Sequence, residues 1–196
     1  MDKGVATYER IVDGAVRMAS RDGLDGLTIG ALAAELGLSK SGLFAHFGSK
    51  EELQLSILGA ALERFQREVL RPAFTEPRGE PRLRAIFDRW LEWSNNPGLP
   101  GGCIFVAAAI ELDDKPGAAR DFLVTAQKTW FKTLGKAAEL AVEAGHFRAD
   151  VDPQQFAFET YAVFLGYHHV RRLLRDRRAE SRARRAFDHI LDAARR

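Results

Sequence analysis

Apolar residues recur every three to four positions along almost the whole chain, which is the period of an α-helix with one buried face. The first stretch shows this period at Ile11, Val12, Ala15, Met18 and Ala19. The composition agrees with it, since the sequence holds 29 Ala and 22 Leu against 10 Val, 7 Ile and 7 Thr. Because β-branched side chains suit a strand better than a helix, the sequence predicts an all-α protein.

Breaks in this period divide the chain into about nine helices. Gly and Pro mark most of the breaks, since Gly adopts left-handed backbone and Pro cannot continue a helix. The expected helices cover about residues 8–22, 28–36, 39–47, 49–71, 81–94, 103–112, 118–144, 153–174 and 179–194, with Pro72 ending the fourth. A boundary between two domains is expected between residues 54 and 55, so that the domains are 1–54 and 55–196.

Several classes of protein are excluded by what the sequence lacks. Its longest apolar run is residues 103–110, far short of the ~20 residues that span a bilayer. Residues 1–20 include Asp2, Glu9 and Asp13, which leaves no signal-peptide core. The single Cys103 cannot form an intrachain disulfide. These features predict a cytoplasmic protein that makes no contact with a membrane.

Enzyme motifs are also missing. The sequence has no phosphate-binding Gly-rich loop, no nucleophile elbow and no metal-ligand spacing. The adjacent His168 and His169 point about 100° apart on a helix and cannot easily share a metal ion. We therefore expect neither catalysis nor a cofactor or metal.

The two short helices at about 28–36 and 39–47 are joined by Gly37-Leu38-Ser39, which is the layout of a helix-turn-helix unit. The residues around them carry a recognisable pattern. It comprises Arg10-Ile11, Ala15, Gly23-Leu24, Gly26-Leu27-Thr28-Ile29, Leu32-Ala33, Leu36-Gly37-Leu38-Ser39-Lys40-Ser41-Gly42-Leu43-Phe44-Ala45-His46-Phe47 and Ser49-Lys50-Glu51-Glu52-Leu53. This stretch resembles the N-terminal domain of the tetracycline-repressor (TetR) family of bacterial regulators. Residues 101–117 also resemble a C-terminal domain seen in some members.

The resemblance implies an all-α homodimer. Each chain would have an N-terminal three-helix helix-turn-helix domain and a C-terminal helical domain for ligand binding and dimerisation. Its partners would be a double-stranded DNA operator with a palindromic sequence and an unknown small-molecule effector that releases it. The function implied is that of a transcriptional regulator, and the first expectation is a repressor. An activator, or a DNA-binding dimer controlled by a protein partner, remains an alternative.

The resemblance also assigns DNA-binding residues. In such units the second helix enters the major groove with its N-terminal residues at the base edges. The positions that match are Thr28, Ser39, Lys40, Ser41, Phe44, Ala45, His46 and Lys50.

Some of these positions have particular roles or plainer alternatives. Thr28 would cap its helix and bond a phosphate, and Ala45 could make only apolar contact with a base. Phe44 departs from the Tyr that is usual in the family, so the phosphate contact of the hydroxyl is lost. His46 could instead be a packing histidine, and Lys50 an ordinary residue in a solvated first turn.

Aromatic residues crowd the second half of the chain. A hydrophobic core would account for most of them, but a mostly apolar pocket is also the usual form of a ligand site. The residues predicted to border an effector pocket are Trp90, Trp93, Phe105, Trp130 and Tyr161. Those predicted at the dimer interface are Phe158, Leu165, Phe187 and Ile190.

Charge is distributed unevenly along the chain. Residues 1–55 carry 6 basic and 8 acidic side chains, whereas residues 171–196 carry 10 Arg and 4 acids. The Arg-rich stretch 171–185 has three interpretations: a solvated helix end, a contact with acids across the dimer, or a direct contact with DNA. Because residues 1–55 have a net charge of −2, we expect a shallow salt dependence of DNA binding.

Overall fold

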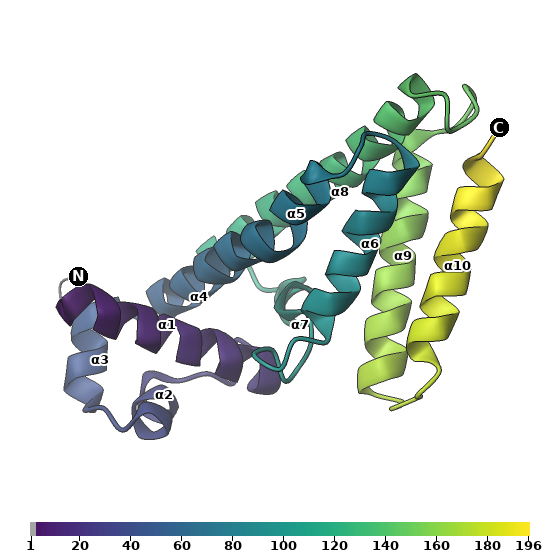
Figure 1. Cartoon of the computed structure of the whole chain (residues 1–196). Coiled ribbons are helices and arrows are strands. Elements are labelled where there is room, and N and C mark those ends of the chain that lie inside the picture. Colours follow the sequence, from purple (N-terminus) through teal and green to yellow (C-terminus); the bar gives the residue numbers. More distant parts are fainter. Residues whose placement is uncertain (1–2) are drawn as a thin grey trace. The chain divides into compact units, whose positions relative to one another are not determined.

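Helices make up the fold of residues 3–196, the part of the chain that the computed structural model describes, with side chains from Tyr8 onward. The elements are α1 (Lys3–Asp22), α2 (Ile29–Leu36), α3 (Lys40–Phe47), α4 (Lys50–Phe65), the π-helical η1 (Gln66–Leu70), α5 (Arg71–Thr75), α6 (Glu80–Ser94), α7 (Ile104–Leu112), α8 (Ala118–Glu143), α9 (Pro153–Arg172) and α10 (Ala179–Ala194) (Figure 1). Since α4, η1 and α5 follow one another without a break, the described residues form nine helical rods. The predicted all-α class is confirmed.

The end of the fourth rod differs from the prediction. The helix does not stop at Pro72 but continues to Thr75, with Pro72 in the first turn of α5. A proline inside an α-helix removes one N–H and its ring clashes with the carbonyl four residues earlier. The π-helical turn of η1 lies immediately before it and widens the helix at that point. The wider turn accommodates a proline that would otherwise end the helix.

The chain folds into two compact units. The first holds residues 1–64 and 95–125, and the second holds residues 65–94 and 126–196. The predicted boundary after residue 54 separates a DNA-binding domain from a domain for ligand binding and dimerisation, and it stays a prediction. Compactness groups α7 and the loop before it with the helix-turn-helix segment.

Ser20 explains why the loop before α7 belongs to the first unit. Its buried hydroxyl accepts a hydrogen bond from the Gly101 N–H at 3.0 Å and donates one to the Gly102 carbonyl at 3.1 Å. The loop is therefore tied to the last turns of α1, and α7 follows directly from it. The first unit packs α1, α2, α3, the start of α4 and α7 around one core, which includes Ile11, Ala15, Leu32, Leu43, Leu53 and Ile57.

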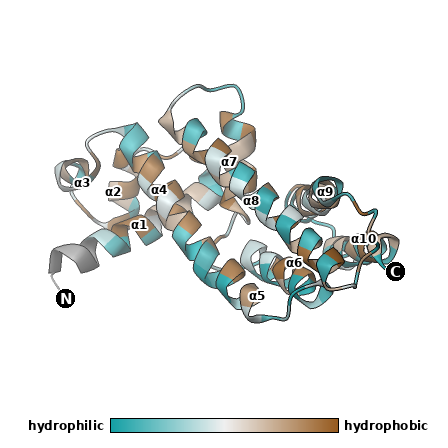
Figure 2. Ribbon diagram, turned by 90° about the horizontal axis from the view of Figure 1, so that it is seen from above, coloured by the Kyte–Doolittle hydropathy of each residue, from teal (hydrophilic) through white to brown (hydrophobic). Residues whose placement is uncertain are grey.

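Stacked aromatic rings fill the second unit. Phe87 of α6 lies parallel to Phe187 of α10, with ring centroids 4.1 Å apart, and Trp90 stacks on Phe164 of α9 at 4.2 Å. The two last helices, α9 and α10, run side by side in opposite directions (Figure 1). Rings at helical spacing on α6 thus join the two last helices into one core. Figure 2 shows hydrophobic and hydrophilic residues on the same helices, as expected for helices with one buried side.

No helix within residues 3–196 has the length and apolar character needed to cross a membrane.

An ionic cluster ties the start of α6 to α10 at the surface of the second unit. The Glu80 carboxylate accepts hydrogen bonds from Arg195 at 2.8 Å and from Arg84 at 2.8 Å, and Arg84 also donates to Asp188 at 2.8 Å. The hydrogen bond from Arg195, followed by that from Arg84, lowers the pKa of Glu80 from 4.5 to about 2, against the opposing effect of partial burial.

This cluster predicts a loss of stability in acid. A lowered pKa in the folded state means that Glu80 stabilises the fold above its ordinary pKa of 4.5, and that this contribution disappears as the pH falls toward about 2. Because the arginines are partly solvated, we expect it to be about 1–2 kcal/mol. Denaturant unfolding of the Glu80→Gln variant should show this deficit at neutral pH and none in strong acid. A deficit of equal size at neutral pH and in strong acid would contradict the prediction.

Candidate nucleic-acid interface

Helix α3 is short, capped at both ends and buried on one side only. The Ser39 hydroxyl accepts a hydrogen bond from the Gly42 N–H at 3.1 Å, which satisfies a backbone donor at the helix start. At the other end, Gly48 has a φ of 67° and donates its N–H to Phe44. Only Leu43 and Phe47 are buried. A helix of eight residues anchored by two side chains leaves its remaining positions facing solvent.

Helix α2 is built in the same way. The Thr28 hydroxyl accepts a hydrogen bond from the Ala31 N–H at 3.1 Å, as the sequence predicts for an N-cap. Gly37 ends the helix in the left-handed conformation, with a φ of 64°. The turn from Gly37 to Ser39 then leads into α3. This arrangement is that of the helix-turn-helix unit predicted from the sequence.

All eight residues predicted to bind DNA are exposed in this structure: Thr28, Ser39, Lys40, Ser41, Phe44, Ala45, His46 and Lys50. The exposed and the buried side of α3 differ most clearly at its two Phe residues, since Phe44 is 54% exposed whereas Phe47 is 3% exposed. An exposed aromatic ring on a helix with a buried opposite side is a feature that a binding partner would explain. Their contacts with DNA stay predictions.

Besides the two capping residues, Lys50 and His46 also have contacts inside the first unit. The Lys50 ammonium donates a hydrogen bond to the backbone carbonyl of Asp25 at 2.9 Å and lies 3.5 Å from its carboxylate. The His46 ring lies near the Tyr8 ring, with centroids 6.2 Å apart. Lys50 is therefore held at the start of α4 by the turn before α2, and a phosphate would have to compete with Asp25 for it.

The residues that hold this turn were not predicted from the sequence. The Glu111 carboxylate of α7 accepts hydrogen bonds from the N–H groups of Leu24 and Asp25, at 2.8 and 3.1 Å. Buried Gln54 donates to the Leu24 carbonyl at 3.3 Å. In the sequence, Glu111 is marked only as the first charged residue after an apolar run, which gives no sign of its partners.

The predicted effector-pocket residues belong mostly to the aromatic core of the second unit. Trp90, Trp93 and Trp130 are buried, and half-buried Tyr161 contacts Phe131 with ring centroids 4.6 Å apart. Phe105, on α7, is part of the first unit. A separate depression of about 520 Å³ in the second unit is lined by charged residues of the ionic cluster, including Glu80 and Arg84. A role of the five predicted residues in effector binding stays a prediction.

The predicted dimer residues divide into two groups. Phe158 and Leu165 of α9 are 60% and 39% exposed, and Ile190 of α10 is half-buried. Phe187 is 2% exposed because its ring stacks on Phe87 within the same chain. Phe187 therefore belongs to the core and is not available to a partner, which corrects that part of the prediction.

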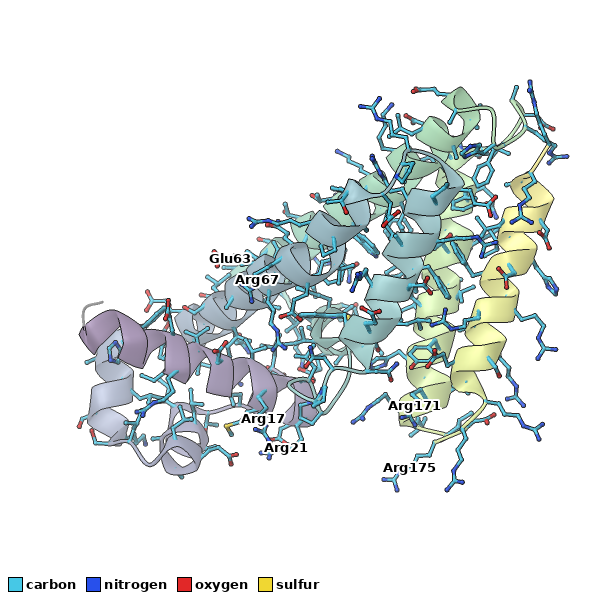
Figure 3. All side chains as sticks on the ribbon, in the orientation of Figure 1. Arg17, Arg21, Glu63, Arg67, Arg171 and Arg175 are labelled. Atoms are coloured by element: carbon cyan, nitrogen blue, oxygen red, sulfur yellow. The ribbon has the colours of Figure 1, made fainter. Side chains whose placement is uncertain are left out.

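The Arg-rich stretch is partly used within the chain. Arg184 forms ion pairs with Asp88 and Glu180, and Arg182 forms one with Asp176. Arg171 and Arg175 extend from the end of α9 and the turn that follows it (Figure 3). The pair of Arg182 with Asp176 is local, while the pair of Arg184 with Asp88 joins α10 to α6. Arg171 and Arg175 leave the contact across the dimer and the contact with DNA as open interpretations.

Comparison with known proteins identifies the family. The model of bacterial regulatory proteins of the tetR family matches residues 11–57, which contain α2 and α3. The model of the tetracyclin repressor-like C-terminal domain matches residues 79–187, more than half of the chain. The chain belongs to the TetR family. TetR-family proteins are DNA-binding transcriptional regulators and not enzymes.

Individual proteins and solved structures are also similar to this chain. A TetR transcriptional regulator from Chloroflexus aurantiacus has a TM-score of 0.86 at 27% identity, covering 98% of this chain and 96% of that one. AibR, crystallised with isovaleryl coenzyme A and operator DNA, has a TM-score of 0.71 at 22% identity, covering 95% and 97% of the two chains. The transcriptional repressor DrrR1 of Streptomyces coeruleorubidus is 38% identical over 71 residues, or 36% of this chain. Those residues span a quarter of DrrR1.

Proposed function

We propose that two copies of this chain bind a palindromic DNA operator, with one α3 helix in each of two successive major grooves. The observation that carries this proposal is the one-sided burial of α3, which leaves Ser39, Lys40 and Ser41 exposed at its N-terminal end. In helix-turn-helix dimers these are the positions that reach base edges, and half-sites lie about 34–36 Å apart.

We further propose that the protein is a cytoplasmic repressor that a small molecule releases from its operator. The stretch shared with the repressor DrrR1 supports the repressor role. AibR, whose fold is similar, was crystallised with both an acyl coenzyme A and its operator, which supports control by a small molecule. The effector of this chain would bind in its C-terminal domain, where an apolar pocket among helices is the usual ligand site.

Selection from random duplex DNA tests the first proposal. Purified protein should enrich a sequence with two inverted half-sites, and one dimer should bind each enriched duplex. Small molecules are then screened for release of that duplex. Enrichment of no sequence would reject the operator proposal. Release by a protein partner alone, or activation of a reporter in place of repression, would reject the corresponding part of the second proposal.

Lys40→Ala tests the contact at the start of α3. If Lys40 contacts a phosphate, the variant should bind all duplexes more weakly and lower the slope of log K against log salt by ~1. If Lys40 reads a guanine edge, the loss should be confined to one base pair and amount to about 1–3 kcal/mol. Fluorescence anisotropy over a range of salt concentrations separates the two results. Lys132→Ala, an exposed lysine on α8, is the control and should bind as the wild type does.

The wild-type salt dependence is a further part of this measurement. Residues 1–55 have a net charge of −2, so few counterions should be released on binding. A slope as steep as ~−10, as in strongly basic interfaces, would contradict this expectation.

A further inference from the structure

The turn between α1 and α2 is held by a side chain from a distant part of the sequence. Leu24 and Asp25 follow the end of α1, and their N–H groups both point to one oxygen of Glu111, at 2.8 and 3.1 Å. Leu24 is 1% exposed, so its N–H has no access to solvent as an alternative. Hydrogen bonds to an ionised carboxylate are stronger than those between neutral groups. Glu111 thus accepts hydrogen bonds from two backbone N–H groups that have no partner within a helix.

Gly23 allows the carboxylate to come this close. A Cβ atom at this position would lie 2.0 Å from Oε1 of Glu111, and the φ of Gly23 is 85°, a conformation that other residues rarely adopt. The turn and the carboxylate are therefore fitted to each other.

The same turn is also bound by Lys115, after α7, and by two residues at the start of α4. The Asp25 carboxylate pairs with Lys115, in the connection after α7, and with Lys50. The hydrogen bond from Lys115 is the main cause of the lowered pKa of Asp25, so this carboxylate stays ionised. Gln54, one turn after Lys50, donates to the Leu24 carbonyl at 3.3 Å. Residues 23–25 thus connect α7 to the first turns of α4.

We propose that Glu111 is a positioning residue for DNA binding, which fixes the turn before α2 and thereby the placement of Thr28 and Lys50. Thr28, the N-cap of α2, comes three residues after Asp25, and Lys50 is bonded to Asp25 itself. A movement of α7 that withdraws the carboxylate leaves two donors unsatisfied and frees the turn. Lys115 keeps Asp25 paired when Lys50 turns toward a phosphate. This inference rests on the proposed function, because it assumes that α2, α3 and the start of α4 meet DNA.

The experiment compares Glu111→Ala with Glu111→Gln, which keeps an oxygen that can accept. Asp114→Ala is the matched control, because it removes the same charge from an exposed position three residues further on. The probes are a duplex that the wild-type protein has selected from a random pool and an unselected random duplex. For each variant, binding to both is measured over a range of salt concentrations, together with amide hydrogen exchange at residues 23–36.

We expect Glu111→Ala to bind the selected duplex at least about tenfold more weakly and to lose less affinity for the random duplex, because the phosphate contacts of Thr28 and Lys50 need a fixed placement only in the specific complex. Exchange should rise at Leu24, Asp25 and α2. Glu111→Gln should fall between Glu111→Ala and the wild type, and Asp114→Ala should match the wild type. A general loss of structure would instead weaken binding to both duplexes alike.

Two kinds of failure can be told apart. If the wild-type protein selects no duplex, the proposed function fails. If it selects one and Glu111→Ala binds it as tightly as the wild type does, or exchange in the turn is unchanged, the role of Glu111 is overturned. Should Glu111→Ala not fold, Glu111→Gln decides alone, and a selected-duplex affinity equal to that of the wild type together with unchanged exchange would overturn the proposal.

Discussion

Replacing Gly101 with alanine is expected to lower the free energy of unfolding of the first unit by about 3 kcal/mol or more. A Cβ atom at this position would lie 1.4 Å from the backbone carbonyl oxygen of Ser20. Neither group is a flexible side chain end, so the loop must move away from α1. That movement also breaks the hydrogen bond from the Gly101 N–H to the Ser20 hydroxyl, which is buried. Thermal and denaturant unfolding followed by circular dichroism would measure the loss.

Gly59→Ala is the matched control for this prediction. Gly59 lies inside α4, and a Cβ atom there would have no atom within 4 Å. Alanine in a helix interior stabilises by about 0.5–1 kcal/mol relative to glycine, so this variant should be slightly more stable than the wild type. Equal effects of the two substitutions would show that the loop does not depend on its close approach to α1.

Replacing Phe47 with alanine should detach α3 from the rest of its unit. Phe47 is 3% exposed and lies beside the Tyr8 ring, with centroids 5.9 Å apart. Truncation of a buried Phe costs about 3–5 kcal/mol through lost burial and the cavity that remains. Leu43 would then be the only buried side chain holding α3. We expect the first unit to unfold at a much lower temperature and specific DNA binding to be lost above that temperature.

Phe44→Ala separates folding from binding on the same helix. Phe44 is 54% exposed, so its removal should change the free energy of unfolding by less than about 1 kcal/mol. Any loss of affinity for the selected duplex should then occur in a fully folded protein. Unfolding curves and anisotropy titrations of the two variants at several temperatures test this difference. A destabilisation by Phe44→Ala as large as that by Phe47→Ala would mean that α3 is not buried on one side only.

The helix-turn-helix unit could be predicted from the sequence because its signals are local. Thr28 and Ser39 accept hydrogen bonds from backbone donors three residues ahead, and Gly37 supplies the left-handed turn that ends α2. These interactions depend only on neighbouring residues and on the backbone preferences of each residue type. The helix beyond Pro72 could not be predicted in this way, because a π-helical turn relieves a clash that the sequence pattern does not reveal.

Periodicity alone could not separate buried from exposed apolar positions. Phe158 and Phe187 both lie on helices with the helical period, yet one is 60% exposed and the other is 2% exposed. The ring of Phe187 is buried because Phe87, one hundred residues earlier, stacks on it. Which of two apolar faces meets another helix depends on how the helices pack.

The sequence by itself determined most of the helices and the caps of α2 and α3, because each follows from interactions within a few residues. Only the tertiary structure decided that Glu111 holds the turn at Leu24 and Asp25, 87 residues away from Leu24, and that Gly101 closes against Ser20. A carboxylate and two backbone N–H groups carry no mark of their partner in the sequence. They find each other only when packing of apolar surface brings α7 against the end of α1, and the hydrogen bonds then fix the contact.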